Sequence, residues 1–462
     1  MKTLFLFTLT IQAQNKNVKS EVKTTVTTIK DSKGEKKLIK TQEVKEVQKI
    51  ELKDADSNEL NKEIKNTPVQ VTAITEVTAN GVSNIVDIDR SAYYNLNGQK
   101  YQVSLVETGY NMYLPNKEKY KKYIDEIYEN GWLTNNGPLV QRLEKRLAQY
   151  LGVKNIILVS NGTVALEIAY RTLDIKGFAI TTPFSFVATT SSLVTNNILP
   201  IFADIDPNSF NLDPKNIEKL ITPNTSAIVP VHVFGNACEV EEIEQIANKH
   251  NLKVVYDAAH AFDVKYKDNS VLNHGDISTL SFHATKLFHT IEGGALIIND
   301  DELVQKVRYL INFGIKNPQE IPHLGTNAKM NEFEAAMGLC ILDDIEDIKT
   351  NRKKVVENYK IGLESLVTFQ KQNEQANENY SYFPIVLENE EELLKIQKVL
   401  NDENIFPRRY FYPSLDTLEY IEPKQECIIS RDISKRILCL PIYAELEKGN
   451  QDKIIDIIRK CY

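Results

Sequence analysis

One lysine in the C-terminal half of the sequence stands where a strand is expected to end. Lys286 follows residues 279–282, a short β-branched and apolar run that predicts a strand, and the glycine pair Gly293-Gly294 comes shortly after it. A lysine at a strand end can be desolvated, which lowers its pKa and suits imine formation with a carbonyl group. A lone lysine is far more often a solvated surface residue, so Lys286 becomes informative only through its neighbours.

Two further segments could supply such neighbours. Asp257 ends the apolar run 252–256, where a semi-buried carboxylate needs a cationic partner; a protonated pyridine nitrogen would serve, and a plain helix cap is the alternative. Residues 160–163 (SNGT) join a predicted strand, 155–160, to a predicted helix, 163–173. Their glycine permits close backbone approach, and a helix N-terminus favours a phosphate, although such a turn is more often an ordinary N-cap.

The order of these segments carries more information than any one of them. A phosphate-type turn, an acid, a lysine and a glycine pair follow one another, each at the end of a predicted strand. In an open α/β sheet, ligands bind beyond the carboxyl ends of the strands. A lysine paired with an acid for a pyridinium nitrogen indicates a pyridoxal 5'-phosphate (PLP) site.

The elements that would position these residues alternate between strand and helix from about residue 106. Short apolar runs at 178–182, 199–205, 227–233 and 295–298 predict strands, and residues 240–250 and 301–313 predict helices. This alternation predicts an α/β fold with a mixed, mostly parallel sheet covered on both faces. A helix from about 346, then residues 382–387 and a helix at 390–401, predict a smaller C-terminal α+β domain. We therefore divide this part into a large domain, 106–345, and a small domain, 346–462.

The first 105 residues differ from the rest in composition and pattern, and they carry no catalytic motif. Residues 1–14 resemble a secretory signal with a short apolar core. Residues 15–66 contain no aromatic residue and no proline, and their charged, low-complexity composition predicts disorder or loose helix. Residues 67–105 alternate more regularly and contain two Asn-Gly pairs, which predicts a small β-rich appendage.

Composition excludes several classes of function. The formal net charge of −8 argues against general nucleic-acid binding. The five cysteines lie far apart without a CxxC pair, so neither a disulfide framework nor a zinc site is expected, and we predict no metal. No apolar run approaches the roughly 18 residues that span a bilayer.

The chain from about 108 to 462 resembles the DegT/DnrJ/StrS family of PLP-dependent sugar-nucleotide aminotransferases. The matching stretches are 131–134 with 137–138, 160–163, 182–189, 200–206, 231–235, 257–261, 281–286 with 292–294, and 325–330. They follow the family order across nearly the whole C-terminal three-quarters of the chain. The resemblance implies the fold-type I, aspartate-aminotransferase-like architecture, to which the N-terminal appendage is extra.

The resemblance also implies roles for single residues. Lys286 matches the Schiff-base lysine that shuttles protons, and Asp257 matches the carboxylate that keeps the pyridine nitrogen protonated. Phe186 matches the aromatic residue that stacks on the ring; ordinary core packing is its alternative. His260 stands where the family more often has Gln, and an imidazole can make the same hydrogen bond to the ring oxygen.

Other positions match the phosphate site and the assembly. Gly162, Thr163 and Ser281 match the phosphate cradle, and Asn327 matches a residue that reaches the phosphate of the neighbouring subunit, which implies a homodimer with shared active sites. Lys329 replaces the usual Arg, which weakens any bidentate carboxylate contact there.

Substrate residues are predicted less directly. The sequence around 132–137 and 281–283 marks a subgroup that resembles enzymes acting on dTDP-linked 4-keto-6-deoxyhexoses, with L-glutamate as amino donor. The only tryptophan stands in a polar loop, and two adjacent arginines precede a tyrosine; these side chains could bind a sugar, a diphosphate or a carboxylate, although a buried Trp and a surface basic pair are the alternatives. The candidates are Trp132, Thr134, Asn136, Arg408, Arg409 and Tyr410.

Two other functions compete with transamination. A PLP-dependent sugar dehydratase of the same family has His where this chain has Lys286, which argues against that reaction. A non-catalytic regulatory protein that kept the fold is the other alternative, and the intact set of site residues argues against it. An enzyme that uses nucleotide sugars and glutamate is expected in the cytoplasm, so we interpret the signal-like start as a fused or mis-started reading frame.

Overall fold

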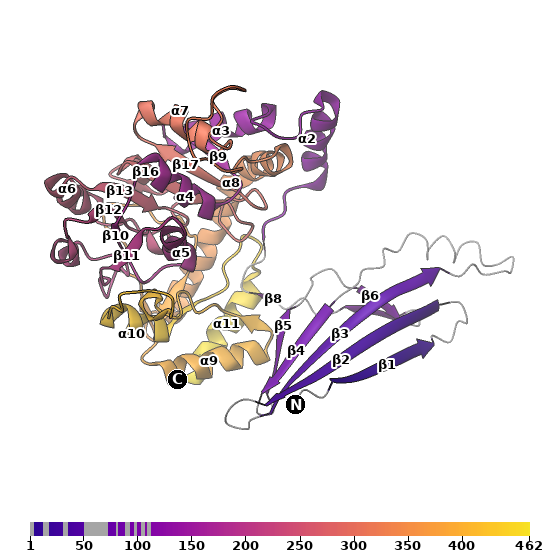
Figure 1. Cartoon of the computed structure of the whole chain (residues 1–462). Helices are drawn as coiled ribbons and strands as arrows, with labels where there is room; N and C mark the ends of the chain where they lie inside the picture. Colours follow the sequence, from indigo (N-terminus) through magenta and orange to yellow (C-terminus); the bar gives the residue numbers. More distant parts are fainter. Residues whose placement is uncertain are drawn as a thin grey trace. The chain divides into compact units, whose positions relative to one another are not determined.

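A computed structural model describes residues 112–462 in full and the backbone of eight strands before them (Figure 1). The chain divides into two compact units, residues 1–106 and 107–462, which are described separately below. The eight strands are β1 (Leu4–Gln12), β2 (Val18–Lys30), β3 (Lys36–Lys49), β4 (Ala73–Ala79), β5 (Val82–Asp87), β6 (Tyr93–Leu96), β7 (Gln99–Gln102) and β8 (Glu107–Thr108).

The N-terminal unit consists of antiparallel strands. β1 to β5 form one sheet in sequence order, and β6 pairs with β7. The prediction of disorder or loose helix for residues 15–66 is wrong for β2 and β3, because most of their uncharged residues are the β-branched Val, Ile and Thr, which favour extended backbone. The rest of that stretch lies outside the described residues. Strands β4 to β7 lie in the stretch expected to be β-rich, and the signal-like reading of residues 1–14 stays a prediction.

The main unit is built on a seven-stranded sheet in the order β11-β10-β12-β13-β16-β17-β9. Only β17 runs against its two neighbours, so the other strands all end at the same edge of the sheet. This confirms the predicted mixed, mostly parallel sheet. The strands are β9 (Ile156–Val159), β10 (Phe178–Thr181), β11 (Leu199–Phe202), β12 (Thr225–Val229), β13 (Lys253–Asp257), β16 (Ile277–Ser281) and β17 (Gly294–Ile298).

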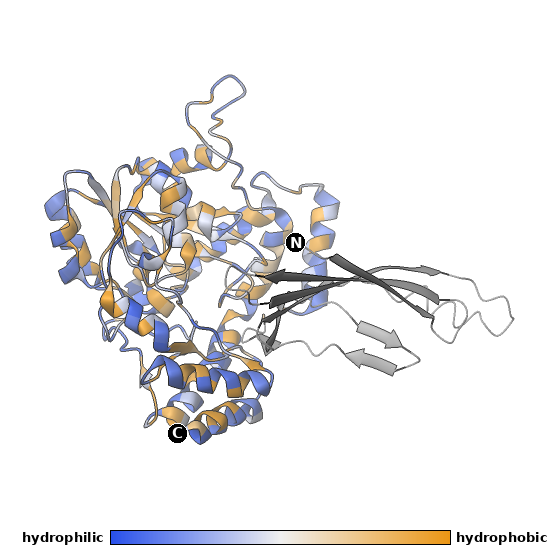
Figure 2. Ribbon diagram, turned by 60° about the horizontal axis from the view of Figure 1, so that its bottom comes forward, coloured by the Kyte–Doolittle hydropathy of each residue, from blue (hydrophilic) through white to orange (hydrophobic). Residues whose placement is uncertain are grey.

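Helices cover both faces of this sheet because its strands are apolar on both sides. In β9, Ile156 and Leu158 join one hydrophobic core, and Ile157 and Val159 join the other. The first core packs against α3 (Pro138–Leu151), α6 (Val240–His250) and the first half of α8 (Glu332–Leu363). The second packs against α4 (Gly162–Thr172), α5 (Val187–Thr195) and α7 (Asp301–Leu310). Figure 2 shows mainly hydrophobic residues in the strands and a mixture of hydrophobic and hydrophilic residues in the helices around them.

Local signals explain where several helices begin and end. Asn161 caps α4, since its side chain accepts a hydrogen bond from the amide of Val164 over 2.8 Å. Asn331 and Glu334 form a capping box at the start of α8. That helix was expected from about 346 and begins at Glu332 instead, so the predicted boundary between the large and small domains falls inside it. The prediction of α6 is confirmed to the residue, whereas α2 (Lys117–Asn130), α3 and α5 were not predicted.

The C-terminal part carries its own core. An antiparallel sheet of β18 (Thr368–Phe369), β19 (Pro384–Val386) and β21 (Ile437–Cys439) packs with the second half of α8, α9 (Glu390–Asp402) and α11 (Lys448–Cys461). α10 (Ile428–Arg436) precedes β21, and β20 (Ile405–Phe406) pairs with β8. These elements agree with a small α+β domain. Among the described residues, no helix combines the length and hydropathy that crossing a membrane requires.

Candidate active site

A cavity of about 320 Å³ lies where the parallel strands of the main sheet end. Its walls combine strand-end residues of the large domain with residues of the C-terminal part. Most residues predicted for the site line this cavity: Gly162, Thr163, Phe186, Asp257, His260, Ser281, Lys286, Arg408 and Tyr410. The sheet thus gathers side chains that lie up to about 250 positions apart, as expected for ligand binding at the carboxyl edge of an α/β sheet.

Lys286 lies in the loop between β16 and β17. Its backbone amide donates to the carbonyl of His283 over 2.9 Å, and its Nζ donates to the hydroxyl of Tyr382 over 3.1 Å. Burial lowers the pKa of Lys286 to about 8, and Tyr410 and the charge of Asp257 work against that change. An amine with this pKa is partly neutral near physiological pH, which a lysine nucleophile requires.

Asp257 is the last residue of β13, and its carboxylate is buried. Thr189 donates its hydroxyl to Oδ2 over 2.7 Å, and the amide of Ala259 donates to Oδ1 over 3.1 Å. Ser185 lies 2.7 Å from the Thr189 hydroxyl, so Thr189 donates to the carboxylate and accepts from Ser185. Burial raises the pKa of Asp257, and the two donors oppose this effect. A cation placed against this carboxylate would stabilise its charged form.

His260 has one ring nitrogen already committed. The amide of Phe234 donates to Nδ1 over 3.1 Å, so Nδ1 carries no proton. Burial holds the pKa of His260 well below its usual range, so the ring is neutral and its proton is on Nε2. His260 lines the cavity and can therefore donate a hydrogen bond to an oxygen bound there.

The turn at 160–163 lies against the paired strands β16 and β17. A Cβ on Gly162 would stand 2.8 Å from Cβ of Ser281, and one on Gly294 would stand 2.6 Å from the backbone of Asn161. Both positions therefore require glycine for this close packing. The first amides of α4, at Gly162 and Thr163, precede any intrahelical partner and suit an anion.

Phe186 precedes α5 and has 53% of its surface exposed, although it is a large apolar side chain. It lines the cavity. The alternative that Phe186 is an ordinary core residue is therefore wrong, because a core phenylalanine would be covered by the chain itself. An exposed aromatic face at a cavity wall suits stacking with a flat ring.

Several predicted residues lie away from the cavity. Asn327 is exposed and accepts a hydrogen bond from Lys329 over 2.6 Å. Trp132, Thr134 and Asn136 form an exposed loop, in which the indole nitrogen of Trp132 donates to the carbonyl of Thr134 over 2.5 Å. The sequence predicted that this loop and Asn327 belong to the active site, but they do not line the cavity of their own chain.

The two adjacent arginines differ. Arg408 is exposed and lines the cavity. Arg409 instead pairs with Glu390 of α9 over 2.6 Å, and its guanidinium lies over the ring of Tyr412 at 3.8 Å. Arg409 does not line the cavity, and its Nη2 is engaged by Glu390 and by the carbonyl of Lys435, so its role as a substrate residue stays a prediction.

Thr189 and Tyr382 contact Asp257 and Lys286, and neither was predicted as a site residue. Thr189 belongs to a stretch that was matched to the family, but its contact with Asp257 depends on how α5 packs against β13. Tyr382 stands 96 positions after Lys286, in a segment without a recognisable motif. Only the long-range fold brings either side chain into place, so neither left a local signal in the sequence.

The residues present fit PLP by the chemistry of their donors. Helix amides at one end suit a phosphate, and an exposed phenylalanine suits the flat ring. A buried carboxylate suits a protonated ring nitrogen, a neutral histidine suits the ring oxygen, and a lysine with a lowered pKa suits the aldehyde. Each group of the cofactor thus has a matching backbone or side-chain group within one cavity.

Comparisons with known proteins agree with this arrangement. The sequence profile of the DegT/DnrJ/EryC1/StrS aminotransferase family matches residues 115–459. A dTDP-4-amino-4,6-dideoxy-D-glucose transaminase of Shigella dysenteriae is 45% identical over 354 residues, 75% of this chain and 96% of that one. One of the same description from Escherichia coli is 38% identical, over 75% and 95% of the two chains. The crystal structure of DesI with its TDP-sugar product is similar with a TM-score of 0.73 and 30% identity, over 77% and 92% of the chains.

Proposed function

This chain belongs to the DegT/DnrJ/EryC1/StrS aminotransferase family, and we propose that it uses PLP to move an amino group from L-glutamate to C4 of a dTDP-linked 4-keto-6-deoxyhexose. The observation that carries the proposal is that Lys286 and Asp257 line the same cavity at the sheet edge. The names of the two transaminase relatives support the nucleotide, the sugar class and the carbon that is aminated.

Lys286 performs two tasks in this proposal. Its neutral amine would hold the cofactor through its aldehyde group, whose oxygen would leave as water, and the freed amine would move a proton at the substrate carbon. The lowered pKa of about 8 lets the amine act as nucleophile and base near neutral pH. Bound PLP supplies the electron sink that stabilises negative charge on that carbon.

The remaining residues hold the ring in place. Asp257, fixed by Thr189 and the amide of Ala259, would keep a proton on the ring nitrogen of bound PLP by charge attraction. His260 would donate from Nε2 to the ring oxygen, and Phe186 would lie against the ring. The amides of Gly162 and Thr163, with Ser281 beside them, would bind the phosphate.

The C-terminal part supplies groups for the substrates. Arg408 is exposed at the cavity wall, where its guanidinium can bind the carboxylate of glutamate or the diphosphate of the sugar nucleotide. Tyr410 lines the same wall and offers a ring and a hydroxyl to a sugar.

We also propose a homodimer that acts in the cytoplasm, in the synthesis of an amino sugar for surface polysaccharide. Asn327 and the exposed loop around Trp132 lie away from the cavity of their own chain, which supports a role at the active site of a second subunit. Nucleotide sugars and glutamate are cytoplasmic metabolites, which supports that compartment.

The experiment that tests this function offers the purified enzyme L-glutamate and a panel of dTDP-, UDP- and GDP-linked keto-sugars, with Lys286→Ala as the inactive control. We expect amination of the dTDP-4-keto-6-deoxyhexose at C4, read by mass spectrometry and NMR. Amination of only a UDP- or GDP-sugar would contradict the substrate and leave the transaminase intact. Amination of none, with PLP bound, would favour the regulatory alternative.

A further inference from the structure

One side chain that contacts Nζ of Lys286 comes from the C-terminal part of the chain. The amine donates to the hydroxyl of Tyr382 over 3.1 Å and lies 5.6 Å from the centre of its ring. Only 6% of Tyr382 is exposed, and its ring packs against His260 with the ring centres 4.5 Å apart. We propose that Tyr382 is a positioning residue, whose hydroxyl holds the amine of Lys286 in place while that amine is not covalently engaged.

The backbone that carries Tyr382 is anchored to the site. The side chain of Asn379 donates to the carbonyl of His260 over 2.8 Å, and the hydroxyl of Ser381 donates to the same carbonyl over 3.1 Å. From the other side, Arg352 of α8 donates to two carbonyls of this segment over 2.9 and 2.6 Å. His260 lines the cavity itself, so these bonds fix the position of Tyr382 relative to the active site.

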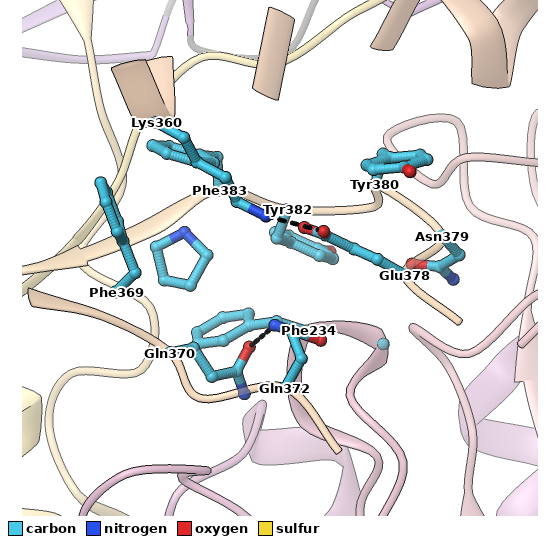
Figure 3. Close-up of a pocket in the computed structure, with 12 residues that line it drawn as sticks. Phe234, Lys360, Phe369, Gln370, Gln372, Glu378, Asn379, Tyr380, Tyr382 and Phe383 are labelled. Atoms are coloured by element: carbon cyan, nitrogen blue, oxygen red, sulfur yellow. Dashed lines mark hydrogen bonds and ion pairs between the residues drawn. The ribbon is translucent and has the colours of Figure 1, made fainter. Parts of the chain in front are cut away.

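The space behind the ring is small. A crevice of about 30 Å³, roughly the volume of one water molecule, lies on the far side of Tyr382, and this tyrosine lines both cavities. The ion pair between Lys360 and Glu378, at 2.8 Å, and a hydrogen bond from Gln372 to Gln370, at 3.2 Å, lie around it (Figure 3). The burial of Tyr382 and its packing against the ring of His260 favour a fixed position of the hydroxyl.

A fixed hydroxyl at Nζ has two consequences for a lysine base. A free lysine side chain has several rotatable bonds, and a hydrogen bond offsets the entropy lost when one rotamer is selected. The charged ammonium donates a stronger hydrogen bond than the neutral amine, so the contact stabilises the protonated state. Burial raises the pKa of the Tyr382 phenol, so the hydroxyl stays protonated and neutral throughout.

The proposal rests on the function proposed above, and it is tested by Tyr382→Phe, which removes only the hydroxyl. The matched control is Tyr380→Phe, two residues earlier in the same segment, at the crevice rather than at the active-site cavity. We expect kcat to fall about 10-fold to 100-fold in Tyr382→Phe, with both KM values within about threefold of wild type. Tyr380→Phe should keep kcat within about twofold.

A second measurement reads Lys286 itself without any sugar. Enzyme loaded with pyridoxamine 5'-phosphate leaves the amine of Lys286 free, and the pH dependence of its acylation, followed by peptide mass spectrometry, reports its pKa. We expect the midpoint in Tyr382→Phe to fall by about half a pH unit or more, and the midpoint in Tyr380→Phe to match wild type. A midpoint unchanged in Tyr382→Phe would overturn the proposal. Since this measurement uses no keto-sugar, an error in the substrate assignment would not affect it.

Discussion

Two regions of the molecule meet at Lys286: the carboxyl edge of the main sheet and the C-terminal region. They are built in different ways. The sheet edge contributes the turn at 160–163, Asp257 and the loop that carries Lys286, each within a few residues of a strand end. The C-terminal region contributes Tyr382, Arg408 and Tyr410. The two tyrosines reach the cavity through a hydrophobic cluster that this region shares with loops of the large domain. The first region has the groups that match a cofactor, and the second has groups suited to the lysine and the substrates. Cofactor chemistry and substrate choice are therefore separable by mutation.

The largest effect is expected at the centre of the sheet edge. Lys286→Ala removes the only amine proposed to bond to the cofactor and to move the proton, so kcat should fall by more than about 10³-fold. The visible absorbance of covalently bound PLP should disappear, while the circular dichroism spectrum stays that of wild type. Turnover retained in this variant would show that another group does the chemistry.

A somewhat smaller effect is expected at Asp257. Asp257→Asn keeps the shape of the side chain and its acceptor for the amide of Ala259, but it removes the charge that keeps the ring nitrogen protonated. We expect kcat to fall about 10²-fold to 10³-fold, with PLP still bound. If kcat stayed within a few-fold of wild type, the carboxylate would be no more than a structural group at the end of β13.

The pH dependence of covalent PLP binding provides a further test of Lys286 at the sheet edge. Only the neutral amine attacks an aldehyde, so a lowered pKa moves the rise in rate to lower pH. With a pKa of about 8, the rate at which cofactor-free enzyme binds PLP covalently should rise with pH up to about 8 and then level off. With an ordinary lysine, the rate would keep rising until the pH approached 10.5, the usual pKa of a lysine side chain. The midpoint should be lower still in Asp257→Asn, because the charge of Asp257 favours the ammonium form.

The smallest effect, on the C-terminal region, distinguishes the two adjacent arginines. Arg408→Ala should raise the KM of one anionic substrate about 10-fold, the loss expected for one charge-assisted hydrogen bond, and leave PLP binding unchanged. Arg409→Ala should leave KM unchanged and lower the melting temperature, because it breaks the ion pair with Glu390. The reverse pattern would mean that the cavity uses Arg409 and that Arg408 is a surface residue.

The two regions also differ in how far the sequence predicts them. Lys286, Asp257 and Gly162 could be found because a strand end, a turn and a glycine are local signals that survive without knowledge of the fold. The hydroxyl of Tyr382 at Nζ, and the occupation of Arg409 by Glu390, depend on contacts between segments that no local pattern connects.

The helices, too, could be predicted only where the sequence carries a local signal. Residues 240–250 show a clear amphipathic period and were predicted to the residue, whereas α5 is mostly Thr, Ser and Val and carries little helical signal. The start of α8 was missed because residues 332–342 are nearly all buried and show no polar face. For α5 and the start of α8, tertiary packing rather than local propensity determines the element.

The most direct test of the central claim is chemical. Holoenzyme treated with borohydride and digested with protease should give one peptide that carries a reduced pyridoxyl group, and tandem mass spectrometry should place that group on Lys286. Modification of any other lysine, or none in protein that retains PLP, would contradict the assignment of Lys286 as the residue that holds the cofactor.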